Sequence, residues 1–362
     1  MTSPTARRSV TYVAVTAAVA VAGLLAGTAT AGATTSTTTS TTTSTVVNTD
    51  LKVASFNLSS LSFDSSATGE HRTWRVRRPV VVAEILKNRP DALGLQEANQ
   101  SSIYTTSVDY GANQFLDLRG ALAAKGGHYA LTNTNPYNCV NPGSSANCVN
   151  KYQGASQDTR IMYNTDTVTL VKQGSVKFTA QTAGKNPRYL AWAVFSMKAT
   201  GKQFFFTSTH LDPYTVSVLR AEWDEVIAYT KRLAGTLPVV AVGDYNTSKF
   251  STYAATYLPK MKAAGYGDVL GQTYATPLSR PRAAVVDRAW VNSYNGYRRD
   301  ARVYAYEDAQ TKIGNNIDWI FAANALPVKK WVTEAPVDRT TFQLVGVIPS
   351  DHFLVQATLT LM

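Results

Sequence analysis

The sequence predicts an α/β protein in which mixed β-sheets are flanked by helices. Apolar, β-branched segments typical of strands alternate with segments that have one apolar helical face. Two strand segments, 189–197 and 203–209, follow each other directly across a Thr200-Gly201 turn. Strand–helix–strand units favour parallel pairing and hairpins require antiparallel pairing, so we expect both kinds of pairing.

Seven short apolar segments are predicted as strands. They cover residues 51–57, 92–96, 189–197, 203–209, 239–243, 317–322 and 353–359. Helices are expected over 78–88, 115–125 and 218–233. The first helix would bury Val81, Val82, Ile85 and Leu86 on one face, and the last repeats this spacing with Leu219, Trp223, Val226, Ile227 and Leu233.

The N-terminal region resembles a targeting segment rather than part of the fold. Residues 1–33 combine Arg7-Arg8, an apolar middle and an Ala-x-Ala ending, the three parts of a secretory signal peptide. A retained membrane anchor is the alternative, because the apolar span is about long enough to cross a bilayer. Residues 34–46 are almost entirely Ser and Thr and are typical of a flexible spacer. We therefore expect a secreted, extracellular protein without a membrane anchor after cleavage, with one folded domain over 47–362.

The composition excludes wholesale disorder and indicates possible polyanionic partners. Hydrophobic residues make up 44% of the chain, enough for a sizeable core. The 35 Lys and Arg residues outnumber the 24 Asp and Glu residues, which gives a net charge of +11. A basic globular body suits nucleic acid, anionic lipid or phosphorylated small molecules, and ordinary solubility is the plain alternative.

The two cysteines, Cys139 and Cys148, exclude a cysteine-rich scaffold and a four-thiolate zinc site. The residues between them are rich in turn formers, so the sulfurs could approach each other easily. Export would favour a disulfide between them. Two free thiols are the alternative.

Polar residues stand at the ends of most of the predicted strands. These residues are Asn57, Glu97, His210, Asp212, Asp244, Asn246, Asp318, Asp351 and His352. Each one alone could be a turn former or a hydrogen-bonded structural residue. Burying an isolated carboxylate costs several kcal/mol unless it is paired or bound to a metal. The set as a whole therefore indicates a functional site.

The residue types in this set suit the hydrolysis of phosphate esters. Asp244 and Asn246 would project to the same side of an extended chain, where they could orient a water and a phosphate oxygen. Carboxylates such as Glu97 and Asp351 are ligands for Mg²⁺, Mn²⁺ or Ca²⁺. His352 titrates near neutrality, and Asp318 could hold its imidazole in one tautomer. Metal-assisted attack of water on a phosphate ester is the reaction that fits.

At this point the chain resembles the endonuclease/exonuclease/phosphatase superfamily, which has the DNase I-like fold. Six segments are similar to its signature blocks, in order over nearly all of 50–361: SFN, LQE, THLD, GDYN, IDWIF and SDHFLV. GEHRTWRVRRP and RYLAWAVF agree as intermediate features. The resemblance implies a four-layer α/β/β/α sandwich of two mixed sheets, with one divalent-metal site at the strand ends. It also implies a catalytic domain over 47–362.

The resemblance also implies roles for individual residues. Glu97 would be the principal ligand of Mg²⁺, with Mn²⁺ or Ca²⁺ as alternatives, and Asn57 and Asp351 would lie near the metal or the phosphate. His210 and Asn246 would contact the scissile phosphate. The remaining roles are Asp244 as the water-orienting carboxylate, His352 as the general acid/base or as a phosphate-binding imidazole, Asp318 as its orienting partner, and Arg160 as a phosphate contact.

The substrate remains open at this stage, because a fold does not decide it. The first expectation is a monomeric nuclease acting on DNA or RNA, with basic and aromatic residues around the entrance. Those residues are Arg72, Trp74, Arg75, Arg77, Arg78, Arg280, Arg282, Arg288, Trp290, Tyr294, Tyr297, Arg298 and Arg299. A phosphatase or sphingomyelinase-like phospholipase C on small or lipid phosphates is the second. A binding module with an inactive site is the third.

Overall fold

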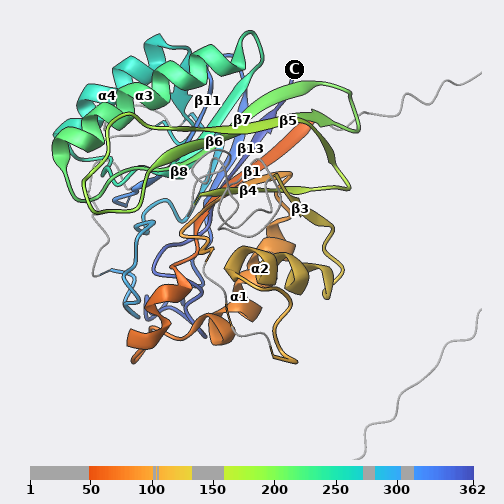
Figure 1. The fold of residues 1–362 in the computed structure, drawn as a ribbon, viewed down its shortest axis with the longest axis vertical. Helices are drawn as coiled ribbons and strands as arrows, with labels where there is room; N and C mark the ends of the chain where they lie inside the picture. The colour runs from red at the N-terminus through yellow and green to blue at the C-terminus, as the bar shows by residue number, and fades with distance from the viewer. Residues whose placement is uncertain (1–48, 101–102, 104–105, 133–158, 272–281, 303–313) are drawn as a thin grey trace, which may run out of the picture. The chain divides into compact units, whose positions relative to one another are not determined.

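Two β-sheets face each other, and each is covered on its outer side by two helices (Figure 1). This computed structural model describes residues 49–100, 103, 106–132, 159–271, 282–302 and 314–362, all within one compact unit. The predicted signal peptide and spacer lie outside the described residues, as do Cys139 and Cys148. Those expectations therefore stay predictions.

The first sheet has seven strands in the order β10-β12-β13-β1-β2-β4-β3. They are β1 (Asp50–Asn57), β2 (Ala92–Gln96), β3 (Tyr129–Leu131), β4 (Arg160–Asn164), β10 (Val285–Asp287), β12 (Val328–Thr333) and β13 (Val355–Thr360). The second sheet has six strands in the order β5-β6-β7-β8-β11-β9. They are β5 (Val168–Lys177), β6 (Tyr189–Met197), β7 (Gln203–His210), β8 (Val239–Asp244), β9 (Tyr266–Asp268) and β11 (Asp318–Ala323).

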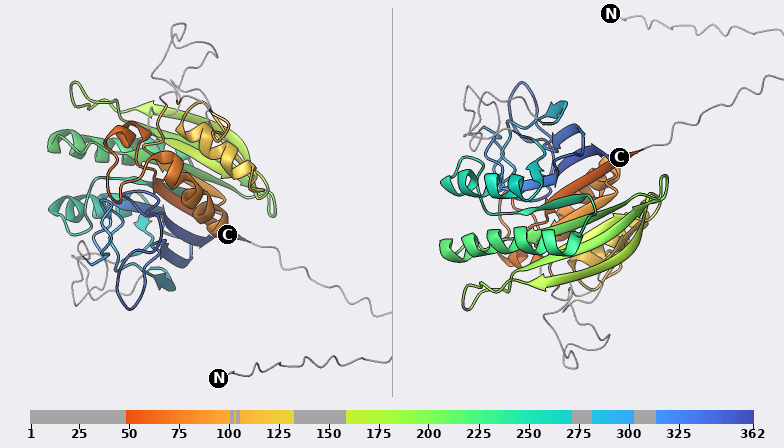
Figure 2. Two further views of the ribbon diagram at one scale, coloured as in Figure 1. Left: turned by 90° about the horizontal axis from the view of Figure 1, so that it is seen from below. Right: turned by 90° about the horizontal axis from the view of Figure 1, so that it is seen from above.

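Four long helices complete the layers. Helices α1 (Trp74–Asn88) and α2 (Gln114–Ala123) pack on the first sheet, and α3 (Val216–Ala234) and α4 (Thr252–Ala263) pack on the second (Figures 1 and 2). A short 3-10 helix, η1 (Leu61–Ser66), precedes α1. The predicted four-layer sandwich of two mixed sheets is confirmed. Among the described residues, no helix is both long and apolar enough to cross a membrane.

The alternation of side chains along each strand creates three apolar layers. In β8, Val240 and Val242 face the core between the sheets, whereas Val239 and Ala241 face α3 and α4. In β1, Val53 enters the same inter-sheet core and Phe56 packs beneath α1 and α2. Strands buried on both faces explain why these segments are continuously apolar in the sequence.

The pairing pattern brings distant strand ends together. β1 and β2 are parallel, and so are β7 and β8, so each pair ends at a common edge. β11 runs antiparallel to β8, and its first residue, Asp318, pairs with the last residue of β8, Asp244. A buried polar link crosses between the sheets beneath this edge, because Gln96 Nε2 donates to Ser208 Oγ at 3.1 Å. The edge is where the polar residues of the sequence analysis collect.

Two helices differ from the sequence-based expectation. α1 begins at Trp74 rather than at residue 78, so Pro79 lies inside it. The carboxylate of Asp64, in η1, accepts the Trp74 backbone N–H at 2.9 Å and caps this longer helix from outside its own segment. α4 was not predicted; it contains Pro259 and buries few residues, so its apolar periodicity is weak.

Gly94, in β2, permits the close approach of the two sheets. A Cβ at this position would collide with Val242 and would lie 2.8 Å from Ser208 Oγ, both in the opposite sheet. We expect Gly94→Ala to destabilise the fold by about 1–3 kcal/mol, because overpacking forces the sheets apart. Urea unfolding measures this loss.

Gly126→Ala is the matched control for this prediction. Gly126 has a positive φ of 78°, but a Cβ there meets nothing within 4 Å. Its cost should be limited to backbone strain, about 1 kcal/mol. If Gly94→Ala destabilises no more than Gly126→Ala, the sheets do not depend on this glycine.

Candidate active site

Asp244 lies at the centre of a buried polar cluster at the shared edge of the sheets. Three side-chain nitrogens point toward its Oδ2 atom: Asn57 Nδ2 at 3.1 Å, His210 Nε2 at 3.6 Å and His352 Nε2 at 3.7 Å. Asn57 ends β1 in one sheet, whereas His210 and Asp244 end β7 and β8 in the other. The cluster therefore joins both sheets around one carboxylate.

Asp318 holds His352 from the opposite side. His352 Nδ1 lies 2.8 Å from Asp318 Oδ2, and both residues are almost fully buried. The backbone N–H of Asp318 donates to Ser293 Oγ at 3.1 Å, which anchors the start of β11. With Nδ1 engaged, Nε2 is the ring atom directed toward Asp244. The structure thus forms the His352–Asp318 hydrogen bond that the sequence analysis expected.

The pKa values in this cluster move in different directions. Burial and the nearby Asp318 charge raise the pKa of Asp244 to about 7. Burial alone would lower the pKa of His352, but the Asp318 and Asp244 carboxylates outweigh it and hold that pKa well above 6.5. Burial lowers the pKa of His210 well below 6.5, and the charges of Arg188 and His352 lower it further. The surroundings therefore favour the cationic form of His352 and the neutral form of His210.

Asn57, Glu97 and Asp351 are linked at the same edge. Asn57 pairs with Gln96, so Glu97 follows directly beside the end of β1. Glu97 has a positive φ of 53°, and its Oε2 accepts the backbone N–H of Ser60 at 2.9 Å. Ser350 Oγ lies 2.7 Å from the Asn57 carbonyl oxygen and 3.2 Å from Asp351 Oδ1. The chain therefore places the three predicted metal-binding residues within one connected loop region.

Exposure divides these residues into a buried set and an accessible set. Asn57, His210, Asp244, Asp318 and His352 are buried, and none exceeds 5% exposure. Glu97, Asn246 and Asp351 are only partly buried. The three partly buried residues are the ones that an incoming ligand reaches first.

Asn246 is placed differently from the extended geometry assumed in the sequence analysis. β8 ends at Asp244, and Asn246 has a positive φ of 45°. Its backbone N–H donates to Asp244 Oδ1 at 2.9 Å, and its side-chain Nδ2 donates to the Leu211 carbonyl at 2.9 Å. A turn, rather than strand alternation, brings Asn246 next to Asp244.

Two further predicted residues occupy structural positions. Arg160, at the start of β4, is fully buried with its guanidinium 4.1 Å from the Phe115 ring centroid. Its predicted phosphate contact stays a prediction. Asp212 accepts the backbone N–H groups of Tyr214 and Thr215 at 2.9 and 2.7 Å, so it shapes the loop before α3.

Several basic residues expected at a substrate entrance make contacts within the fold, and for the fully buried Arg77 that expectation is wrong. Arg77 is fully buried and donates to the carbonyls of Leu58, Ser59 and Pro349. Arg78, Arg282, Arg288 and Arg299 are engaged with acids or backbone carbonyls of the chain. The sequence gives the number of arginines but not their surroundings. It therefore cannot distinguish an arginine on the surface from one that is hydrogen-bonded to loops inside the fold.

A comparison with family models decides the wider relationship. The model of the Endonuclease/Exonuclease/phosphatase family matches residues 54–352, which include the whole cluster around Asp244. The chain belongs to this family. Family membership and the site together support hydrolysis of a phosphate ester.

Individual relatives of this family member are distant. Nocturnin from Drosophila melanogaster is 24% identical over 219 residues, which are 58% of this chain and only 30% of that protein. The mannosyl-6-phosphatase of Bacteroides thetaiotaomicron superposes with a TM-score of 0.60 at 21% identity, covering 86% of this chain and 100% of that one. D. rerio TDP2, complexed with a single-strand DNA product, has a TM-score of 0.52 at 14% identity, covering 87% and 100%. These structural likenesses show a shared fold.

The sequence analysis missed Ser350 altogether and gave Arg77 a different role, at the substrate entrance. Ser350 bridges Asn57 and Asp351, and Arg77 ties the loop after β1 to Pro349, just before Asp351. The only available signal was their place inside recognised motifs, Ser350 in SDHFLV and Arg77 in GEHRTWRVRRP. Their function depends on contacts between segments about 270–290 residues apart in the chain, as the sequence separations of 272 and 293 show.

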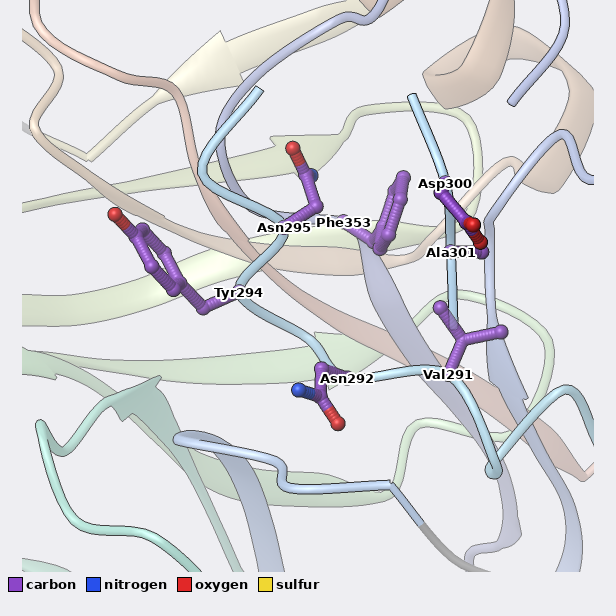
Figure 3. Close-up of a pocket in the computed structure, with 7 residues that line it drawn as sticks. All are labelled: Val291, Asn292, Tyr294, Asn295, Asp300, Ala301 and Phe353. Carbon is purple, nitrogen blue, oxygen red and sulfur yellow. The ribbon is translucent and has the colours of Figure 1, made fainter. Parts of the chain in front are cut away.

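The loop beside His352 adds an exposed aromatic side chain. The Tyr294 ring lies 5.0 Å from the His352 ring in an edge-to-face arrangement and remains 39% exposed. A small cavity of about 10 Å³ lies next to it, lined in part by Asn292, Asn295 and Phe353 (Figure 3). In Figure 3 the Tyr294 side chain extends away from Phe353 and the rest of the cavity lining.

The charges around His352 predict how activity depends on pH. If Asp244 acts ionised and His352 acts protonated, kcat/KM rises with pH near 7 as Asp244 loses its proton, and falls above the raised pKa of His352. Asp318→Asn keeps a hydrogen-bond acceptor but removes the negative charge that raises both pKa values. Both limbs of the profile should shift to lower pH, by about 1–3 pH units, and turnover should fall. An unshifted pH–rate profile in Asp318→Asn would contradict this electrostatic assignment.

Proposed function

We propose that this protein is a secreted, Mg²⁺-dependent phosphodiesterase that cleaves DNA or RNA. The main support for this reaction is the arrangement around Asp244: Asn57, His210 and His352 converge on its carboxylate, and Asp318 bonds to the other side of the His352 ring. Glu97 and Asp351 lie at the same edge of the sheets. Secretion is supported by the signal-peptide pattern of residues 1–33.

The donor atoms suit a hard divalent cation. Glu97 and Asp351 supply partly buried carboxylates, and Asn57 supplies an amide oxygen. Asn57 Oδ1 already accepts the Ser59 N–H at 3.0 Å, but a carbonyl oxygen has a second lone pair. An all-oxygen donor set fits Mg²⁺ better than zinc. When bound, the ion would polarise a phosphoryl oxygen of the substrate.

The chain's own residues would then position the phosphate and the water. Neutral His210 and the half-buried Asn246 lie next to Asp244 and can donate hydrogen bonds to phosphate oxygens. Ionised Asp244 can orient the attacking water and accept a hydrogen bond from it. His352, protonated and held by Asp318, can deliver a proton to the leaving oxygen.

Three observations support nucleic acid as the substrate. The chain has an excess of Lys and Arg over Asp and Glu, which favours a polyanion. Tyr294 offers an exposed ring beside His352, and aromatic rings stack with nucleobases. TDP2, a protein of the same fold, was solved with a single-strand DNA product.

The second candidate is a phosphatase acting on small phosphate monoesters. The similar fold of the mannosyl-6-phosphatase from Bacteroides thetaiotaomicron favours it. A sphingomyelinase-like activity on lipid phosphates has no corresponding observation among the described residues.

A substrate panel tests the proposal. The secreted protein would be incubated with plasmid, single-stranded DNA, RNA, sugar phosphates and sphingomyelin vesicles, with Mg²⁺ and with EDTA. Glu97→Gln protein, prepared identically, measures contaminating activity. We expect cleavage of at least one nucleic acid that requires both Mg²⁺ and Glu97. Release of inorganic phosphate from sugar phosphates without cleavage of nucleic acid would establish the second candidate instead.

A further inference from the structure

Arg188 is a buried cation for which the mechanism above gives no role. It precedes β6, retains only 7% exposure and opens the RYLAWAVF segment. Its guanidinium makes no hydrogen bond or ion pair with any described residue, and its Nε atom is buried without a partner. Only the Nε atom of the guanidinium is fully buried; the two terminal nitrogens keep some accessible surface. A buried charge without a partner is unfavourable unless something else neutralises it.

The fold holds Arg188 beside His210. β6 and β7 are antiparallel with Leu190 opposite Thr209, so the residue before β6 lies next to the end of β7. Gln181 fixes its backbone: the Arg188 N–H donates to Gln181 Oε1 at 2.8 Å, and Gln181 Nε2 donates to the Arg188 carbonyl at 3.0 Å. The charge of Arg188 is close enough to help lower the pKa of His210. The scaffold therefore sets the position of the Arg188 backbone, beside the end of β7 that carries His210.

The nearby acids do not neutralise this charge. Glu222 Oε2 accepts the Asp212 N–H at 2.6 Å, and Asp212 Oδ1 accepts the N–H groups before α3, but neither acid forms an ion pair with Arg188 among the described residues. Burial raises the pKa of Glu222 to about 8, so this acid is largely uncharged at neutral pH. The guanidinium therefore has its charge available for an anion from outside the chain.

We propose that Arg188 is a phosphate-binding residue of the active site, acting next to His210 from the six-stranded sheet. This inference rests on the proposed function, because the anion is taken to be a phosphate of the substrate. A guanidinium presents a planar fork that matches two phosphate oxygens. Glu97 and Asp351, the proposed metal-binding carboxylates, belong to the seven-stranded side, so the substrate phosphate would lie between that metal site and the guanidinium of Arg188 on the other sheet.

Binding of inorganic phosphate tests the proposal without requiring turnover. Isothermal titration calorimetry with Mg²⁺ present would compare wild type, Arg188→Ala and Arg188→Lys. We expect Arg188→Ala to weaken phosphate binding about 10–100-fold, because a hydrogen bond to a charged group is lost. Arg188→Lys keeps the charge but loses the planar fork of the guanidinium, so its phosphate affinity should lie between those of wild type and Arg188→Ala. In steady-state assays Arg188→Ala should raise KM more than it lowers kcat.

Arg232→Ala is the control, because Arg232 is an exposed residue in the last turn of α3. It should bind phosphate like wild type. If Arg188→Ala does not fold, the test is the phosphate affinity of Arg188→Lys compared with that of wild type. Unchanged phosphate affinity with a lowered Tm in either variant would assign Arg188 a structural role and overturn the proposal, as would wild-type protein that binds no phosphate. Absence of ester cleavage alongside Arg188-dependent phosphate binding would instead count against the proposed function only.

Discussion

His352→Ala is expected to lower kcat by about 10²–10⁴-fold, the usual contribution of a positioned general acid or base. The His352 ring is nearly buried, bonded to Asp318 at 2.8 Å and directed toward Asp244 at 3.7 Å. Under the proposed mechanism, its removal would leave no protonated group at the leaving oxygen. The loss should be largest for substrates with poor leaving groups, because an activated leaving group needs little protonation. Rates for a natural ester and a nitrophenyl ester measure this difference.

His128→Ala is the matched control for this variant. His128 is also a histidine beside an aspartate, since its Nδ1 lies 2.8 Å from Asp166 Oδ1. That pair is exposed, stands beside β3 and β4, and has no hydrogen bond to the Asp244 cluster among the described residues. It should retain wild-type activity. If His352→Ala loses less than tenfold for both esters, His352 is a binding or structural residue and not the proton donor.

Glu97→Gln is expected to weaken the apparent affinity for Mg²⁺ by more than about 100-fold, since even groups behind a metal ligand contribute 10–100-fold. Gln keeps the shape and an oxygen that can accept the Ser60 N–H, but it loses the negative charge. Activity at low Mg²⁺ should therefore disappear, with partial recovery at high Mg²⁺. EDTA should abolish wild-type activity, and added Mg²⁺ should restore it.

Two measurements distinguish a metal ligand from a structural acid. Titration of activity with Mg²⁺ gives the apparent affinity, and the rise of Tm with Mg²⁺ reports binding to the folded protein. Asp224→Asn serves as the control, because Asp224 is an exposed acid on α3 paired with Lys260. Equal Mg²⁺ dependence of Glu97→Gln and wild type in both measurements would remove Glu97 from the metal site.

Much of the architecture was predictable because the strands are buried on both faces. The predicted segments 92–96 and 189–197 coincide with β2 and β6, and the others agree within a few residues. Six strands were not predicted, namely the edge strands β3, β5, β9 and β10 and the interior strands β4 and β12. β5 alternates with exposed residues such as Val171, and β3, β9 and β10 have three residues each. Short or half-exposed strands leave too little apolar pattern to distinguish them from loops.

The helix boundaries depend in part on local sequence and in part on contacts with distant residues. The apolar spacing of α3 was sufficient to place it, and its bounds extend the prediction by only a few residues. The start of α1 depends on Asp64, ten residues earlier, whose carboxylate caps Trp74. No local pattern in the helix itself could indicate that contact.

The sequence by itself determined which chemical groups stand at the strand ends, because strand periodicity and residue type are local properties. Glu97, His210, Asp244, Asp318 and His352 were all identified on that basis. Only the tertiary structure decided how they meet. The convergence of both imidazoles and the Asn57 amide on one oxygen of Asp244 depends on the register between strands and on the distance between two sheets. The same holds for arginines. The guanidinium of Arg77 is bonded to four backbone carbonyls, whereas that of Arg188 has no partner among the described residues. Such partners are set by packing between segments far apart in the chain, which local sequence patterns do not encode.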